Sequence, residues 1–349
     1  MRKYHICDTS SISGISRYAE DFYRVLLKPL GFEQLSPELV NTDWIATISK
    51  DCVFHIELGV GQFAERNALV SLIVAGFENI DVTIHDPPWI TFPFYRFLNP
   101  LFNQISKAFD WYLNAAGITG KILKGCRAVY VLTRRGRDLL ESRHGLKNVS
   151  CIPFVIPSDK IWANPLVGGG SNDILYFGFI GPNKGLDYAL AVHSEIRRRN
   201  RDIKMYVVGQ PTNSKAQYYL NKLKNTYSDD VYYLGFVDEA NLDSIFSRVA
   251  HVFLPMKEYK YFCPCSASII ASLRRGRIVW TNPVNAVDEM IQNGSNGRYF
   301  TGVISDDADI FISLISKKEE LRRMSIAALT TCHNLQGELR QWSGEFKNV

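Results

Sequence analysis

The chain has 349 residues, of which 46% are hydrophobic and 21% are charged, and its formal net charge is +5. This composition is typical of a folded globular protein and excludes a largely disordered chain. The length exceeds what one hydrophobic core usually serves, so we expect two domains. The mild positive charge suits an anionic substrate or an anionic membrane surface. It falls short of the dense basic stripe that nucleic-acid-binding proteins carry.

The cysteines and the N-terminus indicate a cellular location. Seven cysteines without regular spacing favour a reducing compartment. The chain turns polar from Asp8 to Ser13, so we expect no signal peptide. No stretch has the uncharged length of a membrane-spanning helix. We therefore expect a cytoplasmic protein, with attachment to the inner face of the membrane left open.

Short apolar runs alternate with helical patterns along the chain, as they do in parallel α/β sheets. The first half contains predicted strands at 4–7, 53–58, 82–85, 128–132 and 149–152. The second half contains predicted strands at 174–177, 205–208, 231–234, 252–254 and 278–280. Apolar residues recur with a period near 3.6 from Ile15 to Leu26 and from Leu186 to Ile196, which predicts a helix at each place.

Prolines and glycines between Pro157 and Ser171, including Gly168 to Gly170, interrupt both patterns and mark a linker. We predict a Rossmann-like N-terminal domain over residues 1–160 and a Rossmann-like C-terminal domain over 161–325. A helical segment over 326–349 is expected to pack back toward the first domain. Open parallel sheets bind ligands at the carboxyl ends of their strands, so we expect a cleft between the two domains.

The most informative motif is the glycine-rich turn from Gly178 to Gly185, which follows the strand predicted at 174–177. It delivers Lys184 just before an amphipathic helix. The glycines let the backbone approach a ligand, the lysine supplies a positive charge, and the helix start supplies amide donors. We predict a phosphate site here. The alternative is a tight connection with a solvated lysine.

A second motif begins at Cys263. Ser266 is a predicted N-cap, so the amides of Ala267 and Ser268 are expected to be free to bind an anion at a helix start. The alternative is an ordinary helix cap. We do not expect zinc, because Cys263 and Cys265 are too close together and no second ligand pair follows.

Three further places carry candidate residues. His85 and Asp86 end a predicted strand, where they could bond a substrate hydroxyl or transfer a proton, or form a structural pair. Gly14 lies in the polar turn from Ser10 to Arg17, which either admits a ligand close to the backbone or only caps a helix. Glu289 precedes a glycine-bounded loop and could hold sugar or ribose hydroxyls. The alternative is that Glu289 is a solvated glutamate on a helix.

Together these pieces resemble the family-four retaining glycosyltransferases (glycosyl transferases group 1), in a branch that lacks that family's Glu-x7-Glu pair. The stretch from Tyr176 to Leu190 resembles the family's strand, Lys-Gly turn and helix. Further matching stretches lie at 131–136, 152–153, 235–255, 276–289 and 294–297. The resemblance covers nearly the entire chain and is strongest in its second half.

The resemblance implies the α/β GT-B fold, with two Rossmann-like parallel-sheet domains facing across a cleft. The domain over 1–160 would bind the acceptor, and the domain over 161–325 would bind the nucleotide-sugar. It implies an enzyme that moves a sugar from a nucleoside diphosphate to a glycan or lipid-linked glycan acceptor, with retention at the anomeric carbon. The setting it implies is bacterial surface polysaccharide synthesis, such as O-antigen, lipopolysaccharide or capsule. No metal or other cofactor and no nucleic acid is implied.

The resemblance also implies roles for the candidate residues. His85 and Lys184 would take part in catalysis, and Asp86 and Trp89 would lie on the acceptor side. The donor would be bound by Gly14, Gly178, Lys184, Ser266, Ala267, Ser268 and Glu289.

Three positions depart from the family. Phe179 stands where many members carry an arginine, and Cys263 and Ala271 stand where many carry the two glutamates. The rival interpretation is a catalytically impaired protein of this fold that binds a sugar nucleotide or a glycan. A related epimerase or hydrolase is a further alternative.

The segment from Pro87 to Leu113 is unusually aromatic. Its rings are Trp89, Phe92, Phe94, Tyr95, Phe97, Phe102, Phe109, Trp111 and Tyr112, with Arg96 and Lys107 between them. We expect this segment to border the acceptor groove and to meet a lipid-linked acceptor at a membrane surface. The alternative is that the rings fill the core of the N-terminal domain.

Overall fold

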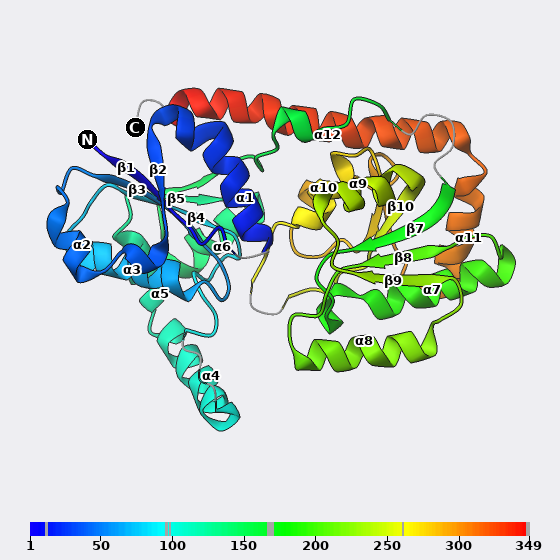
Figure 1. The fold of residues 1–349 in the computed structure, drawn as a ribbon, viewed down its shortest axis with the longest axis horizontal. Coiled ribbons are helices and arrows are strands. Elements are labelled where there is room, and N and C mark those ends of the chain that lie inside the picture. The colour runs from blue at the N-terminus through cyan, green and yellow to red at the C-terminus, as the bar shows by residue number, and fades with distance from the viewer. Residues whose placement is uncertain (11–12, 95–96, 98, 166–170, 260–261, 347–349) are drawn as a thin grey trace. The chain divides into compact units, whose positions relative to one another are not determined.

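The computed structural model describes residues 1–10, 13–94, 97, 99–165, 171–259 and 262–346. Parts of four predicted segments lie outside the described residues, namely 11–12 in the first polar turn, 95–96 and 98 in the aromatic segment, 166–170 in the linker, and 347–349 at the end of the helical segment. The chain forms two compact units (Figure 1). Unit 1 consists of Met1–Pro157, Lys260–Cys265 and Leu335–Val349. Unit 2 consists of Ser158–Tyr259 and Ser266–Asn334.

Within the described residues, unit 1 is built on a six-stranded parallel sheet of order β2-β1-β3-β4-β5-β6. Its strands are β1 Lys3–Ile6, β2 Phe32–Leu35, β3 Val53–Leu58, β4 Ile80–Ile84, β5 Ala128–Val131 and β6 Val149–Cys151. Its helices are α1 Gly14–Phe22, α2 Thr42–Thr47, α3 Phe63–Val74, α4 Pro100–Ala115, α5 Ile118–Lys124 and α6 Arg134–His144.

Unit 2 repeats this plan with a described six-stranded parallel sheet of order β12-β11-β10-β7-β8-β9. Its strands are β7 Ser171–Phe177, β8 Met205–Val208, β9 Val231–Gly235, β10 Val249–Leu254, β11 Ile278–Thr281 and β12 Gly297–Tyr299. Its helices are α7 Leu186–Arg199, α8 Ser214–Thr226, α9 Glu239–Arg248, α10 Ala267–Leu273 and α11 Ile304–Ile315. Helix α12 (Lys318–Phe346) contributes residues to both units.

All the predicted strands are confirmed, with ends that differ by at most three residues. The sequence did not predict β2 and β12. Both are short strands at the edge of a sheet, and β2 buries only Phe32 fully. An edge strand that faces solvent lacks the continuous apolar run by which a central parallel strand is recognised.

The helices bury the faces that their sequence periodicity predicted. Helix α1 starts after Ser13, whose Oγ accepts a hydrogen bond from the Ser16 amide at 3.0 Å, and it buries Tyr18 and Phe22. Helix α7 buries the predicted face from Leu186 to Ile196. No described helix is both long and apolar enough to span a lipid bilayer.

The ionisable side chains buried in unit 2 include His251 on β10, which is fully enclosed. The Trp280 Nε1–H group lies 3.3 Å from His251 Nδ1, toward which it donates, and the Phe311 ring packs at 4.7 Å between centroids. Burial lowers the pKa of His251 to about 3. The folded protein therefore keeps this imidazole neutral at every pH above that value.

We predict that His251 makes the protein sensitive to mild acid. The unfolded chain takes up a proton at His251 below about pH 6.5 and the folded chain does not, so the free energy of unfolding falls as pH drops from about 6.5 toward 3. Between pH 6.5 and 5 this group alone removes roughly 1.5 kcal/mol. Urea unfolding of His251→Gln should therefore show a shallower pH dependence than the wild type. The exposed His333→Gln variant is the control, and equal slopes for His251→Gln and the wild type would refute the assignment.

Candidate functional site

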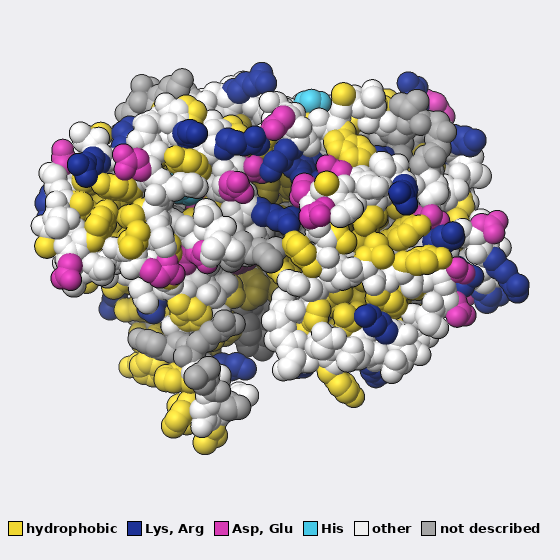
Figure 2. Space-filling model, viewed as in Figure 1, with side chains coloured by type: hydrophobic (Ala, Val, Ile, Leu, Met, Phe, Trp, Pro, Cys, Tyr) yellow, Lys and Arg dark blue, Asp and Glu magenta, His cyan; other side chains and the backbone are white. Residues whose placement is uncertain are grey.

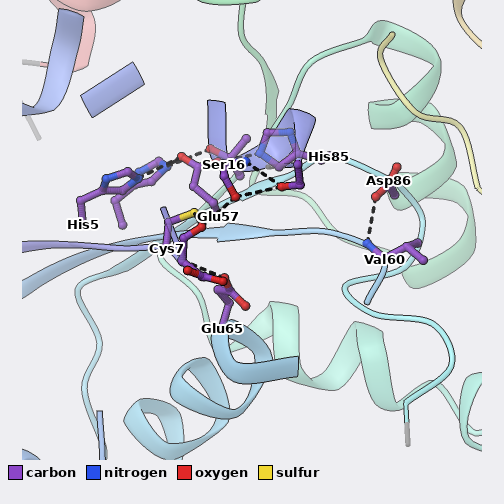
Figure 3. Close-up of polar contacts among 12 residues, drawn as sticks. His5, Cys7, Ser16, Glu57, Val60, Glu65, His85 and Asp86 are labelled. Carbon is purple, nitrogen blue, oxygen red and sulfur yellow. Dashed lines mark hydrogen bonds and ion pairs between the residues drawn. The ribbon is translucent and has the colours of Figure 1, made fainter. Parts of the chain in front are cut away.

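The carboxyl ends of three neighbouring strands bring polar side chains to one edge of the unit 1 sheet. β1, β3 and β4 are adjacent and parallel, so the residues that end them lie side by side. Glu57 is the second-to-last residue of β3, and His85 follows β4 directly. Figure 3 shows both side chains at this edge, together with His5 from β1.

Glu57 is a buried carboxylate surrounded by three imidazole rings. His5 Nε2 lies 3.3 Å and His55 Nε2 3.4 Å from Glu57 Oε1, and His85 Nε2 lies 2.7 Å from Oε2. The side chains of Glu57, His5 and His55 have no solvent exposure. A charge in such a place is stable only when hydrogen bonds replace its hydration. Among the described residues, no three His, Cys, Asp or Glu side chains are arranged as metal ligands.

These contacts set the protonation of the cluster. Burial alone would raise the pKa of Glu57, but hydrogen bonds from His5, His55 and His85 hold that pKa well below its ordinary value. Burial lowers the pKa of His5, against the opposing effect of its hydrogen bond to Glu57. The cluster is therefore an ionised carboxylate that accepts N–H groups, with His5 as a neutral ring.

The hydrogen bond to Glu57 also orients His85. Because the carboxylate can only accept, the Nε2 atom of His85 carries its proton toward Glu57, which in the neutral ring leaves Nδ1 as the acceptor. The edge of the Tyr18 ring packs against this imidazole at 4.9 Å between centroids. The buried Tyr18 hydroxyl has no hydrogen-bond partner among the described residues. His85 is thus a fixed ring that presents one defined nitrogen.

Asp86 and Gly14 lie at the same edge of unit 1. Asp86 Oδ2 accepts a hydrogen bond from the Val60 amide at 2.8 Å, which ties the end of β4 to the loop after β3 (Figure 3). A Cβ atom at Gly59 in that loop would lie 2.2 Å from the Ile15 side chain. The loop therefore packs directly on the start of α1, the helix that begins at Gly14.

Trp89 lies deeper than the other candidates. Only 3% of it is exposed, its ring edge meets His144, and the Arg143 guanidinium lies 4.3 Å from the ring centroid. Phe94 is also buried. These two rings contribute to the packing of unit 1.

In unit 2, the predicted phosphate turn lies directly against the predicted anion-binding helix start. Gly178 follows β7 with φ 133°, and a Cβ atom there would lie 2.8 Å from Ser268 Oγ. A Cβ atom at Gly209, after β8, would lie 1.8 Å from the Gly178 carbonyl oxygen. A Cβ atom at Gly185 would lie 1.9 Å from the carbonyl oxygen of Pro255, after β10. Three strand ends and the start of α10 therefore converge at one place.

Lys184 ends a short 3₁₀ turn in this group and is half-buried. Its Nζ atom lies 5.6 Å from the centroid of the Tyr259 ring. The neighbouring Lys257 pairs with Asp187 at 3.1 Å, whereas no carboxylate of the described residues pairs with Lys184. Its positive charge is therefore not neutralised by the part of the chain that the structure describes.

Ser266 caps α10, as predicted, and its Oγ accepts from the Ile269 amide at 3.4 Å. The amides of Ala267 and Ser268 are the first of the helix, so they have no acceptor within it. Glu289 is exposed and ends a 3₁₀ turn in the loop after β11, the strand beside β10. The structure thus joins Gly178 with Ser268, and it puts Glu289 on a separate loop.

The positions that depart from the family pattern are also described. Phe179 is 38% exposed in the turn between Gly178 and Lys184. Cys263 is buried, and its amide donates to the Pro87 carbonyl at 2.7 Å within unit 1. Ala271 lies inside α10.

Glu57, His5 and His55 were not predicted as site residues from the sequence. Each lies inside a strand whose apolar residues predicted a core position. The available signal was the alternation of His55 and Glu57 in one buried strand, because such polar residues are rarely buried without partners.

Residues 171–317 match a protein-family model described as "Glycosyl transferases group 1". Anabaena HepE, solved in complex with UDP, aligns with a TM-score of 0.72 and 13% identity over 100% of both chains. Sucrose-phosphate synthase from Thermosynechococcus elongatus aligns with a TM-score of 0.75 and 12% identity over 100% of this chain and 99% of the other.

A third similar structure is TarM, with a TM-score of 0.62 and 14% identity over 86% of this chain, which spans only 55% of TarM. The comparison with curated proteins found no match. At these identities the structural likeness shows the fold, and it confirms the expected α/β fold of the GT-B type.

We predict that the charge of Glu57 stabilises unit 1. A glutamine in its place keeps the shape but offers one carbonyl instead of a carboxylate to three imidazole donors, so Glu57→Gln should lower the free energy of unfolding by about 3 kcal/mol at pH 7.5. Urea unfolding followed by circular dichroism measures this.

Glu65→Gln is the matched control, since Glu65 is also buried but accepts a single amide bond, from Asp8 at 3.0 Å. A glutamine carbonyl can replace that acceptor, so a loss below about 1 kcal/mol is expected. Equal losses for the two variants would contradict the proposed role of the three-histidine cluster.

Proposed function

We propose that this chain is a glycosyltransferase of the group 1 family with the GT-B fold. It moves a sugar from a nucleoside diphosphate to a glycan or lipid-linked glycan acceptor, with retention at the anomeric carbon. The observation that carries the proposal is the convergence of the Gly178 turn, Lys184 and the start of α10 at one edge of the unit 2 sheet. Structures of the similar HepE protein with UDP and with UDP-glucose support a nucleotide-sugar donor.

The donor diphosphate binds at this edge through charge and main-chain donors. Lys184 supplies an ammonium group that no described carboxylate neutralises, and the amides of Ala267 and Ser268 supply N–H donors. Gly178 and Ser266 shape the turn and the cap, and Glu289 bonds hydroxyls of the sugar or the ribose. In this assignment Gly14, at the start of α1, also contacts the donor.

These donors act most strongly on the transition state. As the bond from the anomeric carbon to the diphosphate breaks, positive character develops on the sugar and negative charge on the leaving phosphate. Preorganised donors stabilise that negative charge without reorganising, which lowers the barrier. The proposed route uses no metal ion, because Lys184 and the amides provide the countercharge.

Retention follows from attack on the face that the leaving group departs from. The acceptor oxygen forms its bond to the anomeric carbon, and its proton passes to the departing phosphate oxygen. No side chain acts as a nucleophile. His85, held by Glu57 through Nε2, offers Nδ1 to a hydroxyl of the sugar or the acceptor, and Asp86 and Trp89 lie on the acceptor side.

The proposed setting is the assembly of a bacterial surface polysaccharide such as O-antigen, lipopolysaccharide or capsule, at the cytoplasmic face of the membrane. A lipid-linked acceptor suits the mild positive charge of the chain, +5. One observation favours a second candidate function, a sugar-nucleotide binding protein without catalysis. The exposed Phe179 ring occupies the turn where many members carry a cation for the phosphates.

We predict that Lys184→Ala weakens UDP binding at least about tenfold, because a charge-assisted contact to phosphate typically contributes about 1.5–3 kcal/mol. Isothermal titration calorimetry with UDP measures the affinity, with GDP and dTDP for comparison. Lys224→Ala is the matched control, since its Nζ also lies over a tyrosine ring, at 5.3 Å from Tyr233, but on α8. Unchanged UDP affinity in Lys184→Ala would remove Lys184 from the site.

We predict that His85→Ala lowers the rate of UDP-glucose turnover by about 100-fold or more while UDP affinity stays within about threefold of wild type. The donor-hydrolysis rate without acceptor measures this, and the exposed His333→Ala variant should behave as wild type. Equal rates for His85→Ala and wild type would exclude His85 from the chemistry. Binding of UDP-sugars with no turnover by the wild type would instead favour the binding protein.

A further inference from the structure

Helix α4 (Pro100–Ala115) exposes its large apolar side chains, and the side chains that the structure describes as buried on it are polar. The exposed fractions are 67% for Leu101, 53% for Phe102, 57% for Ile105, 49% for Phe109 and 61% for Tyr112. The buried residues are Ser106 and Asp110, at 5% and 0%. This is the reverse of the usual surface helix, which turns its apolar stripe toward the core.

The helical period separates these two sets of residues. Leu101, Ile105 and Tyr112 recur at steps of four and seven, so they lie on one face, with Phe102 and Phe109 beside them. Ser106 and Asp110, four residues apart, lie on the opposite face. Figure 1 shows α4 extending away from the sheet of unit 1, and Figure 2 shows hydrophobic side chains on its outer surface.

The start of α4 is held in place, so the exposed face has a defined direction. Asn99 caps the helix by accepting from the Leu101 amide at 2.8 Å. Asn103 Oδ1 accepts from the Phe97 amide at 2.8 Å, and the Phe97 and Phe102 rings pack at 6.1 Å between centroids. The aromatic side chains are therefore presented by an ordered, capped helix.

In the stretch from 97 to 127, which contains this face, the exposed charged side chains are all positive. Asp110 is the only acidic residue between positions 97 and 127, and it is buried. Lys107 on α4 and Lys121 and Lys124 on α5 are exposed. An apolar, aromatic face on a stretch of chain whose exposed charges are all lysines complements a surface that is apolar inside and anionic outside.

We propose that α4 docks on an anionic lipid bilayer, with its apolar face at the boundary between headgroups and acyl chains and with Lys107, Lys121 and Lys124 against lipid phosphates. Aromatic rings are favoured at that depth, and amphipathic helices bind there parallel to the surface. The 16 residues of α4 make a helix about 24 Å long, and its exposed apolar residues, a strip from Leu101 to Tyr112, span about 16 Å of it. A protein partner would need its own acidic rim to match the lysines, whereas an anionic leaflet provides phosphate everywhere along the strip.

The inference deepens the proposed function and rests on it, because a lipid-linked acceptor lies in a bilayer and α4 belongs to unit 1, the unit assigned to the acceptor. It also revises which aromatic residues meet the membrane. Trp89 and Phe94 are buried, so the lipid contact is made by Phe102, Phe109 and their neighbours on α4.

Vesicle flotation of the full chain tests the proposal. The wild type should float with vesicles of 70% phosphatidylcholine and 30% phosphatidylglycerol and bind pure phosphatidylcholine more weakly. The double variant Phe102→Ser with Phe109→Ser should lose at least about tenfold in apparent vesicle affinity. Tyr218→Ser with Phe236→Ser is the matched control, since both residues are exposed aromatic side chains of unit 2. Its vesicle binding should equal that of the wild type.

A second pair of variants separates charge from apolar contact. Lys107→Glu with Lys121→Glu should lower affinity for the anionic vesicles about tenfold or more and leave weak binding to neutral vesicles unchanged. Lys222→Glu with Lys224→Glu, on the exposed face of α8, is the control. Wild-type protein that floats with neither vesicle, or α4 variants that float as well as wild type, would overturn the proposal. A further outcome is that the chain dimerises without lipid and that Phe102→Ser with Phe109→Ser abolishes the dimer. That result would also overturn the proposal, because the apolar face of α4 would bind a second copy of the chain.

Titration with UDP keeps this result distinct from the proposed function. All α4 variants should bind UDP with wild-type affinity, which also shows that they are folded. A wild-type protein that binds UDP but binds no vesicle would reject the α4 proposal alone. Vesicle binding by a wild type that does not bind UDP would reject the donor site and leave the α4 proposal standing.

Discussion

The donor edge of unit 2 depends on close contact between main-chain segments, and only glycine permits that contact. The carbonyl oxygens of Gly178 and Pro255 lie where the Cβ atoms of Gly209 and Gly185 would be, at 1.8 and 1.9 Å. No side chain fits at such distances, so any substitution would force the ends of β7, β8 and β10 apart. The same contacts fix the position of Lys184 between Gly178 and Gly185. The placement of one ammonium group therefore follows from the absence of side chains around it.

The two units differ in how they pair the charged side chain at the carboxyl edge of their sheets. Unit 2 leaves a cation without a described carboxylate partner, together with helix-start amides, and so favours an anionic ligand. Unit 1 buries an anion, Glu57, and satisfies it internally with three imidazole rings. That internal pairing leaves His85 with a fixed tautomer instead of a free charge. One edge is therefore suited to hold a phosphate, and the other to position a hydrogen-bonding ring.

Much of the fold could be predicted from the sequence because central parallel strands are continuous apolar runs that few other structures share. The edge strand Phe32–Leu35 escaped prediction because half of its side chains face solvent. Glu57 escaped because a strand pattern shows that a residue is buried but not which side chains from other strands it meets. His5 and His85 come from segments 52 and 28 residues away in the chain. The aromatic segment divided in a way that composition cannot show, with Trp89 in the core and Phe102 exposed on α4.

The proposed donor site depends on the convergence of Gly178, Lys184 and the start of α10, and a crystal structure with UDP would show whether the diphosphate binds there. We expect diphosphate oxygens within roughly 2.7–3.2 Å of Lys184 Nζ and of the Ala267 and Ser268 amides. UDP bound elsewhere, with the Lys184 ammonium directed into solvent and the α10 amides bonded only to water, would contradict it.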